Sequence, residues 1–161
     1  MMGRVYTATF KAITVSAAQD LFEITAAADS VVKIHGWTLS QKTETGDAAE
    51  EMLYITTNRG VGSTTSGSGG ASVTPVALEE QDSAFGGTVE RNNTTIMAVG
   101  SGTLRTDLEA YTWNVRVPFP MLYSPEMRPI IGPSNRWTLE LETAPADAID
   151  MCGTVWFEEI G

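Results

Sequence analysis

The strongest constraint on the fold of this chain is the alternation of side-chain type between residues 111 and 121. Large apolar side chains occupy every second position, and polar residues or prolines fill the positions between them. Strand side chains point alternately to opposite faces of a sheet, whereas a helix repeats about every 3.6 residues. The two-residue period therefore predicts an extended segment with one buried face, formed by Tyr111, Trp113, Val115, Val117, Phe119 and Met121.

Two prolines restrict the end of this segment. Pro118 and Pro120 lack the backbone N–H that a sheet ladder needs. Proline is confined to edge strands, strand starts and bulges. The last part of the segment is therefore predicted to be an edge strand or to leave the sheet.

Shorter segments with strand character recur along the rest of the chain, separated by Gly, Pro, Asn and Asp. The alternation within residues 31–41 slips by one position at Gly36, where a β-bulge would restore it. Pro75 makes residues 72–78 an edge strand. The longest helical stretch that we expect is residues 47–52. The predicted strands are 6–12, 21–24, 31–41, 52–57, 72–78, 137–142 and 151–158.

This pattern predicts an all-β protein of roughly eight or nine strands, arranged as an antiparallel two-sheet sandwich or barrel. A jelly-roll-like sandwich is our preferred form, because several connections are long. A chain of 161 residues suits one domain, residues 1–161. Gly/Ser-rich and polar composition predicts mobile loops near 60–71 and 79–95.

The charge of the chain argues against several partners. Ten basic and twenty acidic residues give a formal net charge of -10, and no two basic residues are adjacent. Nucleic acids are usually bound by clustered Lys and Arg, so we expect neither nucleic acid nor an anionic membrane as partner. No apolar run is long enough to span a bilayer, and the N-terminus lacks a secretory apolar core. The single cysteine, Cys152, excludes an internal disulfide and fits synthesis inside a cell.

The inventory of catalytic and metal-binding residues is small. His35 is the one histidine, whereas zinc or a jelly-roll metal site requires several N or S ligands. No G-x-S-x-G nucleophile motif occurs. The adjacent carboxylates at 50–51, 79–80 and 158–159 would point to opposite faces of a strand, and Glu79, Glu80 and Asp82 match no EF-hand loop. We therefore expect a protein that is not an enzyme and binds no cofactor or metal.

Several segments carry apolar side chains on both strand faces. In a monomeric antiparallel sandwich one face of most strands should stay polar. Two explanations remain open: these segments are central strands or covered ends, or they contact another subunit. The residues that would form an oligomer or partner interface are Phe119, Met121, Leu122, Tyr123, Ile130 and Trp156.

The chain resembles small jelly-roll virion structural proteins of tailed phages, of the head decoration or cement type. The resemblance covers much of the chain and rests on short motifs, each of low specificity. They are AQDLFE (18–23), GDAAEEML (46–53), SGSGG (66–70), AFGGTVE (84–90), NNTT (92–95) and VWFEE (155–159).

This resemblance implies a non-enzymatic capsid decoration protein, made in the host cytoplasm, that stabilises the shell from the outer capsid surface. The implied partner is the major capsid protein and the implied state is a homotrimer. Three copies at -10 each would carry -30, which disfavours a position facing packaged DNA. We expect the sandwich to form the oligomer, and the N-terminal strand and long loops to contact the shell.

Two other functions remain as alternatives. A tail- or fibre-associated carbohydrate- or receptor-binding module would stack sugars on exposed aromatic rings such as Trp37, Trp113 or Trp137. Their inward parity favours a place in the core instead. A hydrolase would require His35 and a neighbouring acid to share a pocket.

Overall fold

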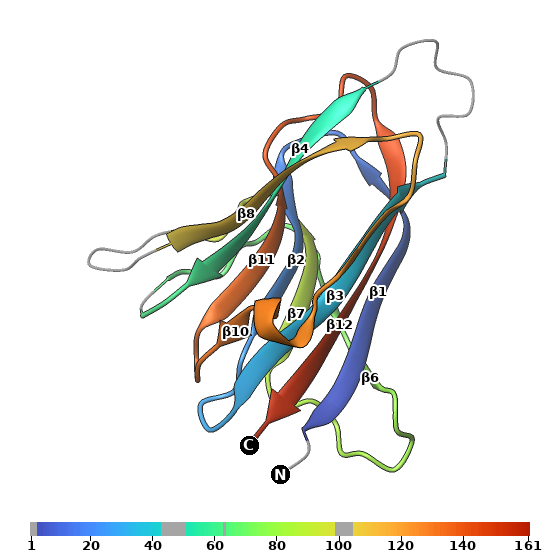
Figure 1. Ribbon diagram of the computed structural model, residues 1–161. Coiled ribbons are helices and arrows are strands. Elements are labelled where there is room, and N and C mark those ends of the chain that lie inside the picture. Colours follow the sequence, from blue (N-terminus) through green and yellow to red (C-terminus); the bar gives the residue numbers. More distant parts are fainter. Residues whose placement is uncertain (1–2, 43–50, 63, 99–104) are drawn as a thin grey trace.

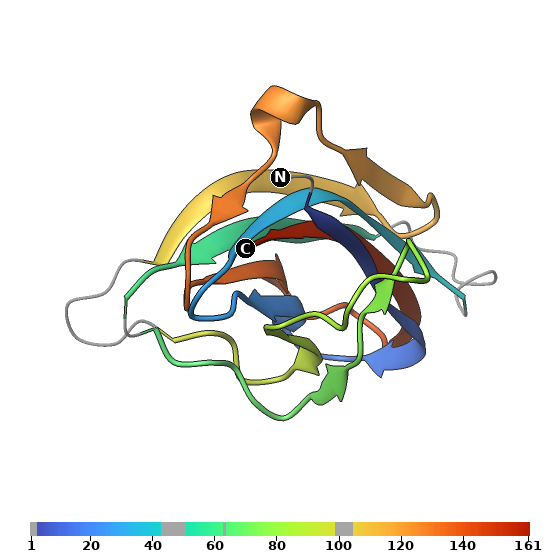
Figure 2. The same ribbon diagram turned by 90° about the horizontal axis from the view of Figure 1, so that it is seen from below.

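A computed structural model describes residues 3–42, 51–62, 64–98 and 105–161 of the chain. In these residues two antiparallel six-stranded sheets pack face to face, and the one helical element is a short 3-10 turn, η1 (Pro125–Met127) (Figures 1 and 2). The predicted all-β antiparallel sandwich is confirmed, while its jelly-roll form stays a prediction. Residues 47–50 of the expected helical stretch lie outside the described residues, and Met52 begins a strand.

Sheet A contains both ends of the chain. Its strand order is β10-β3-β12-β1-β6, and β9 also pairs with β3. Arg4 is the register partner of Glu159, so the first strand lies against the last over almost its whole length. The strands are β1 (Arg4–Val15), β3 (Val31–Gln41), β6 (Val76–Ala77), β9 (Phe119–Leu122), β10 (Ile130–Ile131) and β12 (Ile149–Ile160).

Sheet B has the order β5-β7-β2-β11-β4-β8. Its long strand β8 pairs only with β4 and forms one margin of the sheet (Figure 1). The strands are β2 (Gln19–Thr25), β4 (Met52–Gly60), β5 (Ala71–Val73), β7 (Thr88–Asn93), β8 (Arg105–Asn114) and β11 (Arg136–Leu141).

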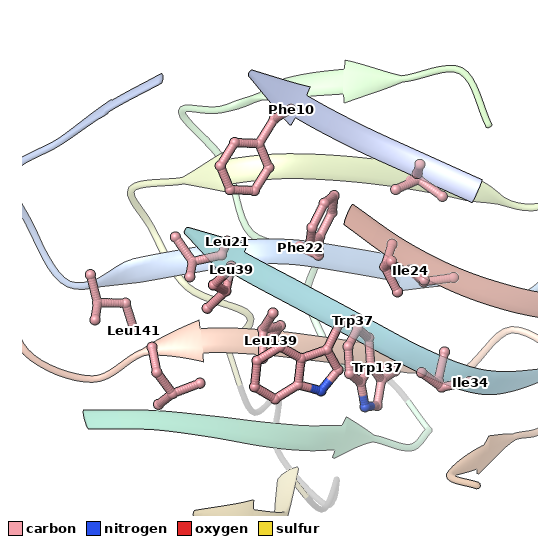
Figure 3. Close-up of a cluster of buried hydrophobic side chains, with 14 of the residues drawn as sticks. Phe10, Leu21, Phe22, Ile24, Ile34, Trp37, Leu39, Trp137, Leu139 and Leu141 are labelled. Carbon is pink, nitrogen blue, oxygen red and sulfur yellow. The ribbon is translucent and has the colours of Figure 1, made fainter. Parts of the chain in front are cut away.

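The core lies between the two sheets and is built by alternating residues of both (Figure 3). Strand β12 alternates buried and half-buried residues without interruption, as a period of two requires. Gly153 interrupts the apolar set because the ring of Phe10 occupies the space that its side chain would take. Phe10 in turn packs on Phe22 of sheet B, with ring centroids 5.1 Å apart. Gly153 thus permits a close aromatic contact between the sheets.

The alternating segment 111–121 divides between the two sheets. Its first part belongs to β8 in sheet B, and its last part forms β9 in sheet A, paired with β3. The chain leaves the sheet between Asn114 and Phe119, as expected from Pro118. The predicted buried face is wrong at Val117, which is 60% exposed in the crossing; the alternation resumes at Phe119, because inward side chains of either sheet face the same core.

Two other predicted segments differ in detail. Residues 72–78 divide at Pro75 into β5 and β6, which are edge strands of different sheets. Strand β7 lies inside the predicted loop 79–95, where its polar sequence conceals it. The predicted bulge in β3 is confirmed, because Trp156 pairs with Gly36 and Phe157 with Ile34, leaving His35 as the extra residue. Among the described residues no helix is long and apolar enough to cross a membrane.

Candidate interaction surface

The outer face of sheet A carries exposed apolar side chains along one row of neighbouring residues. The register places Val76, Thr7, Trp156, Gly36 and Leu122 side by side across five strands. Leu122 is 72% exposed and Val76 63% exposed, with the partly buried Trp156 between them. Directly opposed residues of antiparallel strands project to the same face, so the row forms one surface.

Gly36 makes the centre of this row flat. A side chain at Gly36 would stand within 2.8 Å of Leu122 Cδ2 and would collide with the backbone of Met121. Leu122 therefore lies across the glycine. Ile130, 49% exposed, pairs with Lys33 one row away and extends the apolar area.

A small charged cluster borders the row. Glu158 accepts hydrogen bonds from His35 Nε2 at 3.0 Å and from the Gly3 backbone N–H at 3.1 Å, and Lys33 Nζ lies 3.6 Å away. Partial burial alone would raise the pKa of Glu158, but the His35 hydrogen bond and the nearby Lys33 charge lower it below its usual value. The carboxylate is thus held ionised by its neighbours.

The outer face of sheet A is electrically balanced, unlike the chain as a whole. The charged side chains that its strands direct outward are Lys11, Lys33, Asp150 and Glu158, two of each sign. The net charge of -10 therefore resides elsewhere in the chain. An acidic partner meets less repulsion here than on other faces. We call this surface the sheet A face.

The structure separates the six predicted interface residues into two groups. Leu122, Ile130 and Trp156 lie on the sheet A face. Phe119 and Met121 pack against the core, and Phe119 lies 4.9 Å from Trp37 between ring centroids.

Tyr123, the sixth residue, is buried. Its hydroxyl accepts a hydrogen bond from Trp37 Nε1 at 3.1 Å and donates to Glu109 at 2.5 Å. Burial, with the Glu109 hydrogen bond next, raises the pKa of Tyr123. These contacts within the chain account for the core-facing position of Tyr123.

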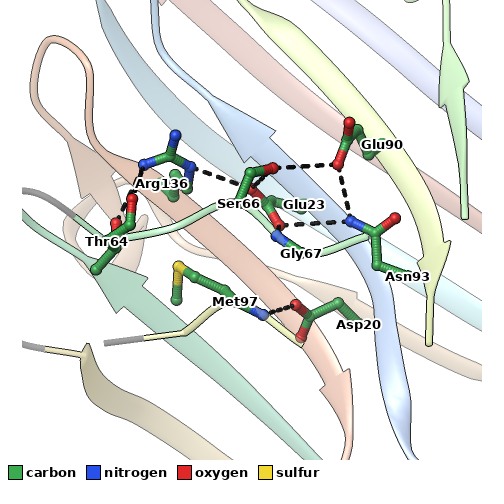
Figure 4. Close-up of polar contacts among 9 residues, drawn as sticks. All are labelled: Asp20, Glu23, Thr64, Ser66, Gly67, Glu90, Asn93, Met97 and Arg136. Carbon is green, nitrogen blue, oxygen red and sulfur yellow. Dashed lines mark hydrogen bonds and ion pairs between the residues drawn. The ribbon is translucent and has the colours of Figure 1, made fainter. Parts of the chain in front are cut away.

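A second candidate site, which is polar, lies on the outer face of sheet B (Figure 4). Residues 64–68 and 94–98 form a short two-stranded ribbon through reciprocal backbone hydrogen bonds of Thr65 with Ala98 and of Ser68 with Thr95. We call this ribbon the strap. Carboxylates of β2 hold it: Glu23 accepts from the Ser66 hydroxyl at 2.7 Å and from the Gly67 N–H at 2.8 Å, and Asp20 accepts from the Met97 N–H at 2.6 Å.

Glu23 is the centre of this polar cluster. Its side chain is 1% exposed, and Arg136 Nε lies 3.1 Å from Glu23 Oε1. Glu90, its register partner on β7, is bridged to it by Ser66 and Asn93. Glu23 is thereby fully engaged in fastening the strap to the sheet.

Sequence reasoning considered only adjacent carboxylates and missed the Glu23–Glu90 pair, which forms across strands. A usable signal was present. Glu23 is an acid inside the apolar run from Leu21 to Ile24. A charge within a core strand requires a partner. The strap also includes part of the predicted mobile loop 60–71. Polar contacts and the buried side chain of Met97, which is 1% exposed, position the strap, and the mobility of the loop stays a prediction.

The other candidate residues do not converge with His35. Pockets of about 520 and 430 Å³ flank the loop 78–84, and neither His35 nor Glu158 lines them. Glu79 and Glu80 are exposed at this loop. Within the described ranges no group of three or more His, Cys, Asp or Glu side chains is arranged to hold a metal ion. Trp37, Trp113 and Trp137 are 0%, 3% and 0% exposed, as their parity predicted.

Comparison with known proteins gives no relative: no family model, no curated protein and no solved structure matches this chain.

Proposed function

We propose that this chain is a non-enzymatic virion structural protein of the capsid decoration type, which binds the outside of a phage head through the sheet A face. The observation that carries the proposal is the pair of exposed apolar side chains Val76 and Leu122, with half-buried Trp156 between them, on an electrically balanced surface. Exposed apolar patches of this kind mark interaction sites. The resemblance of the sequence motifs to virion proteins supplies the class of partner, the major capsid protein.

The position of β1 bears on the expectation that the N-terminal strand contacts the shell. The N-terminal strand is paired with β12 over almost its whole length, so residues 4–15 belong to the sandwich and do not extend as a free arm. We therefore assign the shell contact to the sheet A face. A homotrimer on the outer capsid surface remains part of the proposal, supported by the resemblance and by the acidity of the chain.

The alternative function, a carbohydrate- or receptor-binding module, lacks the exposed aromatic rings on which it was expected to stack sugars. The three tryptophans proposed to stack on sugars lie in the core, where no ligand ring can reach them. Trp156 lies on the sheet A face, but half-buried beside Gly36 and Thr7.

The test uses purified particles that lack this chain, to which wild type or variant protein is added back. Wild type should bind and restore resistance to heat. The double variant Leu122→Ser/Ile130→Ser should bind at least about tenfold more weakly, because two apolar contacts are removed. Thr9→Ser, at an exposed position of the same face, is the matched control and should bind normally.

Two outcomes would contradict the proposal. The decoration role is wrong if particles without the chain resist heat as well as complete ones. The assignment to the sheet A face is wrong if the double variant binds as tightly as wild type. Electron microscopy of decorated particles gives an independent reading of which face meets the shell.

A further inference from the structure

The free edges of the two sheets differ sharply in how they are protected. Natural sheets blunt their edges with short strands, prolines and charges, because an open edge can pair with another chain. In the described residues β5, β6 and β10 have three, two and two residues, and β9 has four, including Pro120. Strand β8 has ten residues and no proline. Its outer edge has no strand partner among the described residues, and the same holds for β1 beyond Thr7, where a bulge between Phe10 and Ile13 interrupts that strand.

The first part of β8 is protected against pairing with another chain. The open edge is therefore limited to the second part of the strand. A bulge interrupts its pairing with β4 near Leu108, and the charged side chain of Asp107 is exposed beside the bulge. From Ala110 to Asn114 the strand is regular and uncharged. Tyr111 faces the core yet stays partly exposed, so this stretch is open to solvent.

Two backbone hydrogen bonds establish which backbone groups of β8 face away from β4. Val115 N–H donates to Glu51 C=O across the β4–β8 pair, and Glu142 N–H donates to Tyr54 C=O on the other side of β4. Pairs in an antiparallel ladder alternate between bonded and non-bonded. Tyr54 pairs with Thr112, so Thr112 and, two residues away, Ala110 direct N–H and C=O groups away from β4.

We propose that β8 pairs antiparallel with β8 of a second copy of this chain, around a two-fold axis at Tyr111. In this register Ala110 lies opposite Thr112 of the other copy, and the reverse. The four outward groups of Ala110 and Thr112 in each copy then form four hydrogen bonds with those of the other copy. A two-fold contact uses the same patch on both copies and closes at two.

The register is also compatible with the side chains. Tyr111 meets its own counterpart, and Glu109 lies opposite Trp113 of the second copy, so no like charges are directly opposed. Exposed Met52 and Tyr54 of β4 lie beside Asn114 and Thr112 on the outer face. Pairing would shield this apolar area from water. Ala110 and Thr112 of one copy match Thr112 and Ala110 of the other in this register, which favours a second copy as the partner.

This inference does not depend on the proposed function, because the sheet A face and the β8 edge are different surfaces. A threefold assembly through other contacts can coexist with pairing at β8. The net charge of -10 on each copy opposes association, so the dimer should strengthen as salt screens that repulsion.

The experiment measures the mass of the full chain by analytical ultracentrifugation at about 100 µM protein in about 0.1 M and about 0.5 M salt. Wild type should show an assembly whose mass Thr112→Pro halves. Proline removes the outward N–H of Thr112 and leaves the β4–β8 hydrogen bonds in place. The dissociation constant should rise at least about tenfold. Thr112→Val keeps the N–H and is the matched control.

A second variant guards against misfolding of the proline variant. Ala110→Lys/Thr112→Lys places like charges opposite each other only in the paired state, and should also halve the mass. Thermal unfolding should show that each variant remains folded. Wild type that stays monomeric at both salt concentrations overturns the proposal. So does an assembly whose mass neither folded variant changes.

Discussion

At the scale of single residues, the buried or half-buried carboxylates of this protein act as fasteners. Glu159 accepts a hydrogen bond from the Arg4 guanidinium at 2.8 Å, from the Ser30 hydroxyl at 3.2 Å and from the Gly86 N–H at 3.1 Å. Glu158 holds Gly3 and His35 on the opposite face of β12. Two adjacent acids therefore secure the start of β1 from both sides of the sheet.

Glu158 provides a test of this fastening by pH. Its pKa is lowered in the folded protein, so its contribution to stability is present above the unfolded value of 4.5 and is lost as pH falls through the folded value. Glu158→Gln should lower the melting temperature at pH 7. The difference from wild type should shrink as the pH falls below 4.5.

Calorimetry of both proteins across this pH range measures the effect. Asp147→Gln, at an exposed position outside the strands, is the control and should melt like wild type at each pH. A Glu158→Gln deficit that stayed constant into strong acid would show that shape, and not charge, matters at this position.

At the scale of elements, the strap shows that a largely polar segment can be built into a fold by hydrogen bonds to carboxylates, together with the buried side chain of Met97. Sequence composition alone predicts a mobile loop for residues 60–71, because it contains almost nothing to bury. The structure instead supplies charged acceptors from the neighbouring sheet. Hydrogen bonds to a charged acceptor contribute more than neutral ones, which compensates for the scarcity of apolar side chains in residues 60–71.

Glu23→Gln should weaken this attachment. Glutamine keeps the shape of the side chain but removes the charge opposite Arg136, leaving a largely buried guanidinium without its partner. Loss of one member of a buried ion pair costs about 3 kcal/mol of unfolding free energy. Amide hydrogen exchange of residues 64–68 should accelerate more than that of β12.

The matched control is Glu80→Gln at an exposed loop position, which should change neither stability nor exchange. Equal stability of Glu23→Gln and wild type in urea would show that the strap does not depend on this charge.

At the scale of the whole molecule, the fold is closed by its two ends. Strand β12 pairs with both β1 and β3, and its register partner for Arg4 is Glu159. The centre of sheet A therefore forms only when residues more than a hundred positions apart meet. Sheets dominated by such non-local pairs fold slowly, because loop closure precedes the gain from contacts.

We accordingly expect refolding from denaturant to take about 1 ms to seconds. Stopped-flow tryptophan fluorescence measures it, because Trp37, Trp113 and Trp137 become buried on folding. Complete refolding within a few microseconds would mean that local contacts, and not the β1–β12 pairing, determine the rate.

The sequence by itself determined the fold class of this protein and, for most strands, which face points to the core. Alternation from Tyr111 to Met121, the slip at Gly36 and the prolines at 75 and 118 were sufficient, because each acts through local backbone and side-chain geometry. The same parity placed Trp37, Trp113 and Trp137 in the core.

Only the tertiary structure decided which strands are neighbours, and with it the candidate surfaces. Leu122 is exposed and Met121 core-facing because β9 pairs with β3 at Gly36, a partner that no local pattern names. Glu23 and Glu90 meet because β2 and β7 are adjacent. Pairing between strands distant in sequence depends on the packing of the whole chain, and this is why one sequence predicted the layers but not these sites.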